Sequence, residues 1–136
     1  MGKARTLVVD ASDTATETVS ALEDGDHEVT VAESLSDALL KLRERRPDAV
    51  VTEYRLPDGD GGELLREIRE TDERLPVVVY TEHGSERVAS ECVDAGVSAY
   101  IPKDGSEARE RLTETVEDHL VTRLSNSASE DLPTPS

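Results

Sequence analysis

Short runs of apolar, mostly β-branched residues alternate along this chain with stretches whose apolar residues recur every three or four positions. The runs have the length of buried strands, and the stretches have the period of amphipathic helices. Five such alternations require right-handed crossovers, which build a parallel sheet covered by helices on both faces. The predicted strands cover residues 6–9, 28–31, 49–51, 77–80 and 97–101, and the predicted helices cover residues 14–24, 35–46, 62–71, 85–95 and 106–123. The fold class is therefore α/β, a doubly wound five-stranded parallel sheet flanked by five helices.

The length and the apolar pattern restrict the class of protein further. A chain of 136 residues has the size of one domain. No apolar run approaches the roughly 20 residues of a membrane span. The single cysteine, Cys92, cannot form an internal disulfide, so we expect a reducing, cytoplasmic setting.

The charge is strongly negative, with 31 acidic and 15 basic residues and a net charge of −16. Such a surface repels nucleic acid and anionic membranes, so we expect neither as a partner. Only Lys3, Lys41 and Lys103 are lysines. A surface rich in acids and poor in lysine is typical of haloarchaeal proteins, in which high salt screens the self-repulsion. We interpret the composition in that way, and an acidic protein with a biased codon supply is the plainer alternative.

The last residues differ in composition from the rest of the chain. Residues 125–136 are rich in serine, acidic residues and proline, which is typical of a linker. We therefore predict an ordered domain at residues 1–124 and a flexible C-terminal tail or linker at residues 125–136.

Polar residues stand where the predicted strands end. In doubly wound sheets the working site lies beyond the carboxyl ends of the strands. The first, third and fourth strands end at Asp10, Glu53 and Thr81, and Lys103 follows the fifth. Carboxylate oxygens suit a divalent cation, whereas lysine and threonine suit phosphoryl oxygens. Each residue alone has a plainer role, such as Thr81 capping the next helix, but the four together indicate a phosphoryl-type site.

The chain resembles the response-regulator receiver domain, which has the CheY-like fold, over residues 5–122. The resemblance depends on the segments at residues 7–10, 47–48, 53–61, 76–81, 95–96 and 100–103. It implies the strand order 2-1-3-4-5. It also implies that Glu53 stands at the phosphoacceptor position, Asp10 in the acidic pocket, Thr81 and Lys103 at the phosphate site, and Tyr100 at the aromatic switch.

Two departures from the family pattern affect this chemistry. Glu53 replaces the phosphoacceptor aspartate, and Ala11 replaces the second acid after the first strand. The missing acid and the acceptor are family ligands of Mg²⁺, so we expect no metal site, with Asp10 and Glu53 the candidates for weak Mg²⁺ binding. The extra methylene of Glu53 shifts its carboxylate by about 1 Å, which costs about a hundredfold in a positioned reaction. We expect Asp13 or Ser12 to cap the first helix rather than to restore the pocket.

The resemblance also implies a docking face, made by the fourth helix, the fifth strand and the fifth helix. We assign to this face the mixed charges of Arg87, Glu91, Asp94, Glu107, Arg109, Glu110 and Arg111. Mixed charge suits a specific, salt-dependent contact with a partner, and the same face could carry a homodimer.

Two other kinds of site are less favoured by the sequence. Residues 58–61 suggest a calcium loop, but Gly62 and Arg69 stand where an EF-hand needs ligands. A flavin site on the same topology would lack Trp and Phe for stacking.

These observations predict an atypical receiver, or pseudo-receiver, of a two-component system. It would act by phosphorylation-independent protein–protein contact and would not be an enzyme. The expected partner is a histidine kinase, a transducer or an output domain, which could belong to the same longer chain with this domain at its N-terminus. The alternative is a stand-alone response regulator that accepts a phosphoryl group with Mg²⁺. The sequence leaves open whether Glu53 locks an active-like state or only marks the loss of phosphorylation.

Overall fold

The computed structural model describes residues 3–131, with side chains as far as Arg123. Within these residues a parallel sheet contains β1 (Ala4–Val9), β2 (His27–Ala32), β3 (Ala49–Thr52), β6 (Val77–Thr81) and β7 (Ala99–Pro102). The strands lie in the order β2-β1-β3-β6-β7. Counted along the chain, this is the order 2-1-3-4-5, and the predicted fold class is confirmed.

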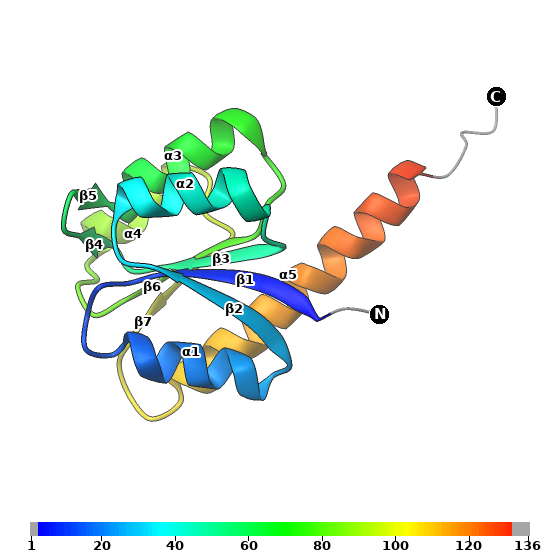
Figure 1. The fold of residues 1–136 in the computed structure, drawn as a ribbon. Helices are drawn as coiled ribbons and strands as arrows, with labels where there is room; N and C mark the ends of the chain where they lie inside the picture. The colour runs from blue at the N-terminus through cyan, green and yellow to red at the C-terminus, as the bar shows by residue number, and fades with distance from the viewer. Residues whose placement is uncertain (1–2, 132–136) are drawn as a thin grey trace.

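Helices cover both faces of the sheet (Figure 1). On one face lie α1 (Ala15–Asp24) and α5 (Ala108–Asp131), and on the other lie α2 (Leu35–Arg45), α3 (Gly61–Thr71) and α4 (Glu86–Asp94). The residues of β3 and β6 are buried throughout, as expected for central strands that pack against helices on both sides.

Each face of the sheet has its own hydrophobic cluster. Leu22 of α1 and Leu112 and Val116 of α5 pack on one face. Leu64 of α3 and Cys92 of α4 pack on the other. Burial raises the pKa of the Cys92 thiol to about 11, which agrees with a packing role.

The loop after β3 contains a short hairpin that the sequence pattern did not predict. Its strands are β4 (Arg55–Leu56) and β5 (Gly59–Asp60), which pair antiparallel. Asp58, at the hairpin turn, accepts hydrogen bonds from the backbone N–H groups of Leu35 (2.7 Å) and Ser36 (3.0 Å). These bonds lower the pKa of Asp58 and tie the hairpin to the start of α2. The hairpin therefore holds the segment that follows β3 in place.

Three of the helices begin with side-chain caps. Ser34, Asp60 and Ser85 each accept a hydrogen bond from a backbone N–H three residues on, a contact that contributes about 1 kcal/mol. The predicted cap of α1 by Asp13 or Ser12 is wrong. Helix α1 starts after Thr14, whose side chain makes no capping hydrogen bond. The Ser12 hydroxyl does not cap the helix, because it donates to Asp10 instead.

Helix α5 is longer than predicted. It ends at Asp131 rather than near residue 123, and its last turns extend beyond the sheet (Figure 1). The segment predicted as a tail therefore begins in helical conformation, and the domain boundary at residue 124 stays a prediction. Residues 132–136 lie outside the described residues. None of the helices in the described range is long and apolar enough to span a bilayer.

Candidate functional site

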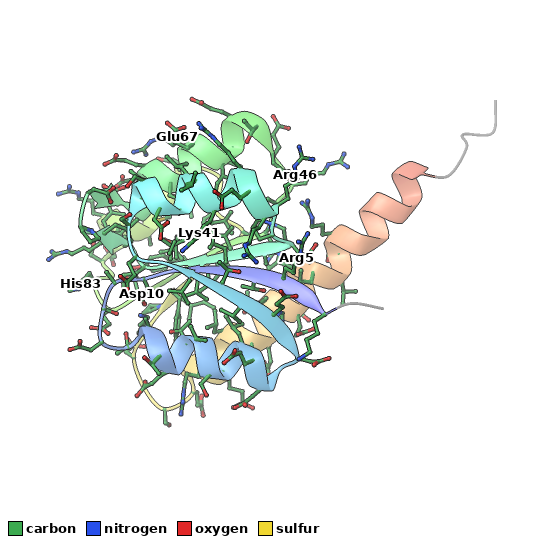
Figure 2. The ribbon with its side chains drawn as sticks, in the orientation of Figure 1. Arg5, Asp10, Lys41, Arg46, Glu67 and His83 are labelled. Carbon is green, nitrogen blue, oxygen red and sulfur yellow. The ribbon has the colours of Figure 1, made fainter. Side chains whose placement is uncertain are left out.

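The sheet itself brings the predicted site residues together. Backbone hydrogen bonds join Asp10 to Ala32, Glu53 to Val9, and Lys103 to Thr81, at 2.8 to 2.9 Å, so the ladder continues past the strand ends. Asp10 and Glu53 are each 3% exposed and Thr81 is 1% exposed. Figure 2 shows Asp10 at one end of the molecule, opposite Arg5 and Arg46. The carboxyl end of the sheet thus buries two carboxylates and a hydroxyl.

The Glu53 carboxylate is bonded through both of its oxygens. Oε1 accepts hydrogen bonds from the Thr81 hydroxyl and, at 2.7 Å, from the backbone N–H of Tyr54. Oε2 accepts from the backbone N–H of Glu82 at 3.1 Å and lies 3.4 Å from the ammonium nitrogen of Lys103. The carboxylate is therefore held by a hydroxyl, two backbone N–H groups and an ammonium.

Lys103 links the two buried carboxylates. Its Nζ donates to Asp10 Oδ2 at 2.8 Å and to the Thr14 hydroxyl at 2.9 Å. The side chain is only 6% exposed, and its ammonium lies 5.2 Å from the centre of the Tyr80 ring. One buried ammonium beside two buried carboxylates offsets part of their desolvation, and the hydrogen bonds offset more.

These contacts also test whether a magnesium ion fits the site. Asp10 Oδ1 accepts from the backbone N–H and the hydroxyl of Ser12 at 2.7 and 2.6 Å, so every oxygen of Asp10 and Glu53 already has a donor. Ala11 supplies no ligand. Among the residues with described positions, no group of three metal-binding side chains occurs. The donor set therefore does not fit a magnesium site.

Tyr100 lies on β7, beside β6. It is partly buried, packs against the cluster that includes Cys92, and lines the hollow between α4 and β7 beside Thr81. Its hydroxyl is buried and makes no hydrogen bond within the described residues. A side chain at Gly84 would overlap that hydroxyl, so the glycine permits the inward position of the ring. The switch role of Tyr100 stays a prediction.

Sequence analysis missed four residues that complete the site, namely Ser12, Thr14, Tyr54 and Glu82. Thr14 donates to a carboxylate oxygen of Glu82 at 2.6 Å. Tyr54 donates its backbone N–H to Glu53 and its hydroxyl to Glu91 at 2.7 Å. Their positions in the sequence could have identified these residues, because each of the four lies within a few residues of a strand end.

The residues assigned to the docking face do not all line one surface. Arg87, Glu91 and Asp94 line a groove between α4 and α3, together with Arg66 and Arg69, whereas Arg109 lines a hollow between α1 and α5. In the groove, Glu91 lies 3.7 Å from Arg66. Arg87, Glu91 and Asp94 therefore lie on the side of α4 that faces α3. Glu91 is held there by its contacts with Tyr54 and Arg66.

A family model matches most of the chain. The family described as response regulator receiver domain matches residues 6–117. Response regulator MprA from Mycobacterium sp. (strain KMS) is 38% identical over 102 residues, which are 73% of this chain and 44% of the relative. A protein-glutamate methylesterase/protein-glutamine glutaminase from Nocardioides sp. (strain ATCC BAA-499 / JS614) is 34% identical over 128 residues, covering 88% of this chain and 34% of the relative. The chain thus spans less than half the length of these curated relatives.

A solved structure shares the same architecture. The response regulator receiver domain protein (CheY-like) from Methanospirillum hungatei JF-1 aligns with a TM-score of 0.82 at 26% sequence identity. The alignment covers 92% of this chain and 99% of that one.

Proposed function

The chain belongs to the response regulator receiver domain family, and on that premise we propose that it is an atypical receiver that signals by protein–protein contact without accepting a phosphoryl group. The observation that carries the proposal is the bonding of Glu53. Its two carboxylate oxygens contact the Thr81 hydroxyl, the Lys103 ammonium and two backbone N–H groups. A phosphoryl group would have to displace this carboxylate from every one of them.

The geometry of Glu53 also opposes its use as a nucleophile. An in-line attack needs a carboxylate oxygen aimed at phosphorus and a cation to offset the negative charge on the phosphoryl oxygens. Here both oxygens of Glu53 accept hydrogen bonds, and the Lys103 ammonium donates to Asp10 Oδ2. We infer that the site needs no metal and works in one fixed state.

Because the proposed site has one fixed state, we propose that the surface helices make the contact through which the protein signals. We propose that the partner is a histidine kinase, a transducer or an output domain, in a separate protein or in the same longer chain. The face of α4, β7 and α5 is the proposed contact, and it includes Val93, which is 65% exposed. The net charge of −16 suits a cytoplasm of high salt, and we propose no nucleic acid, membrane or substrate as its target.

A phosphorylatable response regulator is the second candidate. It is favoured by the presence of Asp10, Thr81 and Lys103 in one buried cluster, and by the names of relatives such as response regulator MprA. In this function Glu53 would accept the phosphoryl group with Mg²⁺, despite the bonding described above.

The mass of the intact protein tests the two candidates. Wild type, Glu53→Asp and the double variant Glu53→Asp/Ala11→Asp are incubated with acetyl phosphate and Mg²⁺ at high salt, and folding is checked by circular dichroism. We expect no phosphoryl adduct on wild type and an adduct on the double variant. An adduct on folded wild type would overturn the proposal and favour the second candidate.

A further inference from the structure

Two hollows flank the buried carboxylates without reaching them. One, of about 660 Å³, lies between α1 and the start of α5, and the other, of about 380 Å³, lies between α4 and β7. Glu82 and Lys103 line both hollows, whereas Asp10 and Glu53 line neither. The side chains of Glu82 and Lys103 therefore form the partition between the hollows, directly beside the acceptor position.

One hydrogen bond holds this partition in place. The Thr14 hydroxyl, in the loop after β1, donates to the Glu82 carboxylate, in the loop after β6, over 2.6 Å. This is a charge-assisted hydrogen bond between two loops, and Glu82 is an exposed residue. The Thr14 oxygen also accepts from Lys103 at 2.9 Å, and the Glu82 backbone N–H donates to Glu53 at 3.1 Å. With the 3.4 Å contact between Lys103 Nζ and Glu53 Oε2, these contacts form a closed ring of four residues.

We propose that Thr14 and Glu82 form a latch that closes the carboxylate pocket to small dianionic phosphoryl donors. The latch acts through a bond across the opening and through the negative charge of Glu82, which repels a dianion. The inference rests on the proposed function and adds a second determinant to it. Restoring an aspartate at position 53 and an acid at position 11 would not restore full access while Glu82 is present.

Labelling by acetyl phosphate measures this access. The background is the full 136-residue chain with Glu53→Asp/Ala11→Asp, in which the introduced carboxylate attacks phosphorus and acetate leaves. Glu82→Ala removes the bond and the charge, whereas Glu82→Gln removes the charge and keeps an acceptor for Thr14. Glu86→Ala is the matched control, because Glu86 is also exposed and lines the smaller hollow, but makes no bond across the opening within the described residues.

The latch predicts a graded result. We expect labelling at least about tenfold faster with Glu82→Ala, an intermediate gain with Glu82→Gln, and no change with Glu86→Ala. Equal rates with and without Glu82→Ala, or no labelling in either, would overturn the latch. Labelling of wild type would instead overturn the proposed function, so the two failures are distinguishable.

Amide hydrogen exchange tests the latch in the wild-type background without any phosphoryl chemistry. The Glu82 N–H is protected by its bond to Glu53, and opening the latch should expose it. We expect exchange at this amide about tenfold faster in Thr14→Val and in Glu82→Ala, and little change in Thr14→Ser, which keeps the hydroxyl. Unchanged exchange in both Thr14→Val and Glu82→Ala would show that the bond does not close the pocket.

Discussion

The two ends of the sheet bury polar groups in different ways. At the carboxyl end, Lys103 joins Asp10 and Glu53, and each of the three side chains is at most 6% exposed. At the amino end, His27 is 4% exposed and bridges the Thr6 hydroxyl (2.9 Å) to the Glu117 carboxylate (2.7 Å). The Glu117 side chain, however, is 52% exposed.

This difference sets how each network responds to the loss of one member. A group whose partners are all buried cannot recruit water when a partner is removed, so the loss leaves an uncompensated charge. A group whose partner lies in solvent can exchange that partner for water at small cost. The carboxyl end should therefore be sensitive at every position, and the amino end only at its inner members.

The largest expected effect is that of Lys103→Met. It removes the ammonium from between two buried carboxylates and should lower the free energy of unfolding by about 3 to 5 kcal/mol. Urea unfolding followed by circular dichroism at constant high salt measures this loss. Lys3→Met is the control, because Lys3 pairs with Asp26 where both side chains are more than half exposed, and should cost less than about 1 kcal/mol. Similar losses in the two variants would contradict the comparison.

Thr6→Val tests the inner part of the amino-end network. Thr6 is 1% exposed, and its replacement leaves a ring nitrogen of His27 without its partner. We expect a loss of about 1 to 3 kcal/mol, the cost of a buried polar atom without a hydrogen bond. Thr30→Val on the neighbouring strand is the matched control, since Thr30 is only partly buried and has no side-chain hydrogen bond among the described residues. It should change stability by less than about 0.5 kcal/mol.

Glu117→Gln tests the outer part of the same network. The amide can still bond to His27, and the lost charge is half in solvent, so the expected loss is below about 1 kcal/mol. The remaining loss of stability should become smaller as the salt concentration is raised, because salt ions screen interactions between exposed charges. A loss as large as that of Thr6→Val would mean that solvent does not replace this partner.

The sequence pattern was sufficient to predict the meeting of Asp10, Glu53, Thr81 and Lys103, because parallel strands place their carboxyl ends at one edge. The strand order was predicted from the resemblance to the receiver family. The sequence was not sufficient to predict the rotamer of Glu53. That rotamer depends on where the hydroxyl and backbone donors of neighbouring loops lie, which no periodicity encodes.

The same limit explains the other errors. The hairpin of β4 and β5 has two residues per strand and no apolar alternation, and Asp58 stabilises it by binding to the distant start of α2. The cap of α1 was assigned to Asp13 or Ser12 because both residue types are good caps, but a buried carboxylate at Asp10 takes the Ser12 hydroxyl. A tertiary contact therefore decides the hairpin, and a local bond to a buried carboxylate decides the start of α1.

The smallest expected effect is that of magnesium, and it separates a sealed network from a binding site. A ligand that binds only the folded protein raises its stability with the logarithm of concentration, by about 2.7 kcal/mol at 100 times the dissociation constant. Because the oxygens of Asp10 and Glu53 are all bonded within the protein, about 10 mM Mg²⁺ at constant ionic strength should shift the thermal midpoint of wild type by less than about 1 °C. The variant Glu53→Asp/Ala11→Asp has an added carboxylate at position 11 and a shorter acidic side chain at position 53. It should gain stability as the Mg²⁺ concentration rises. A midpoint that rises steadily with Mg²⁺ in wild type, but not in Asp10→Asn, would mean that the carboxyl end is an open site rather than a closed network.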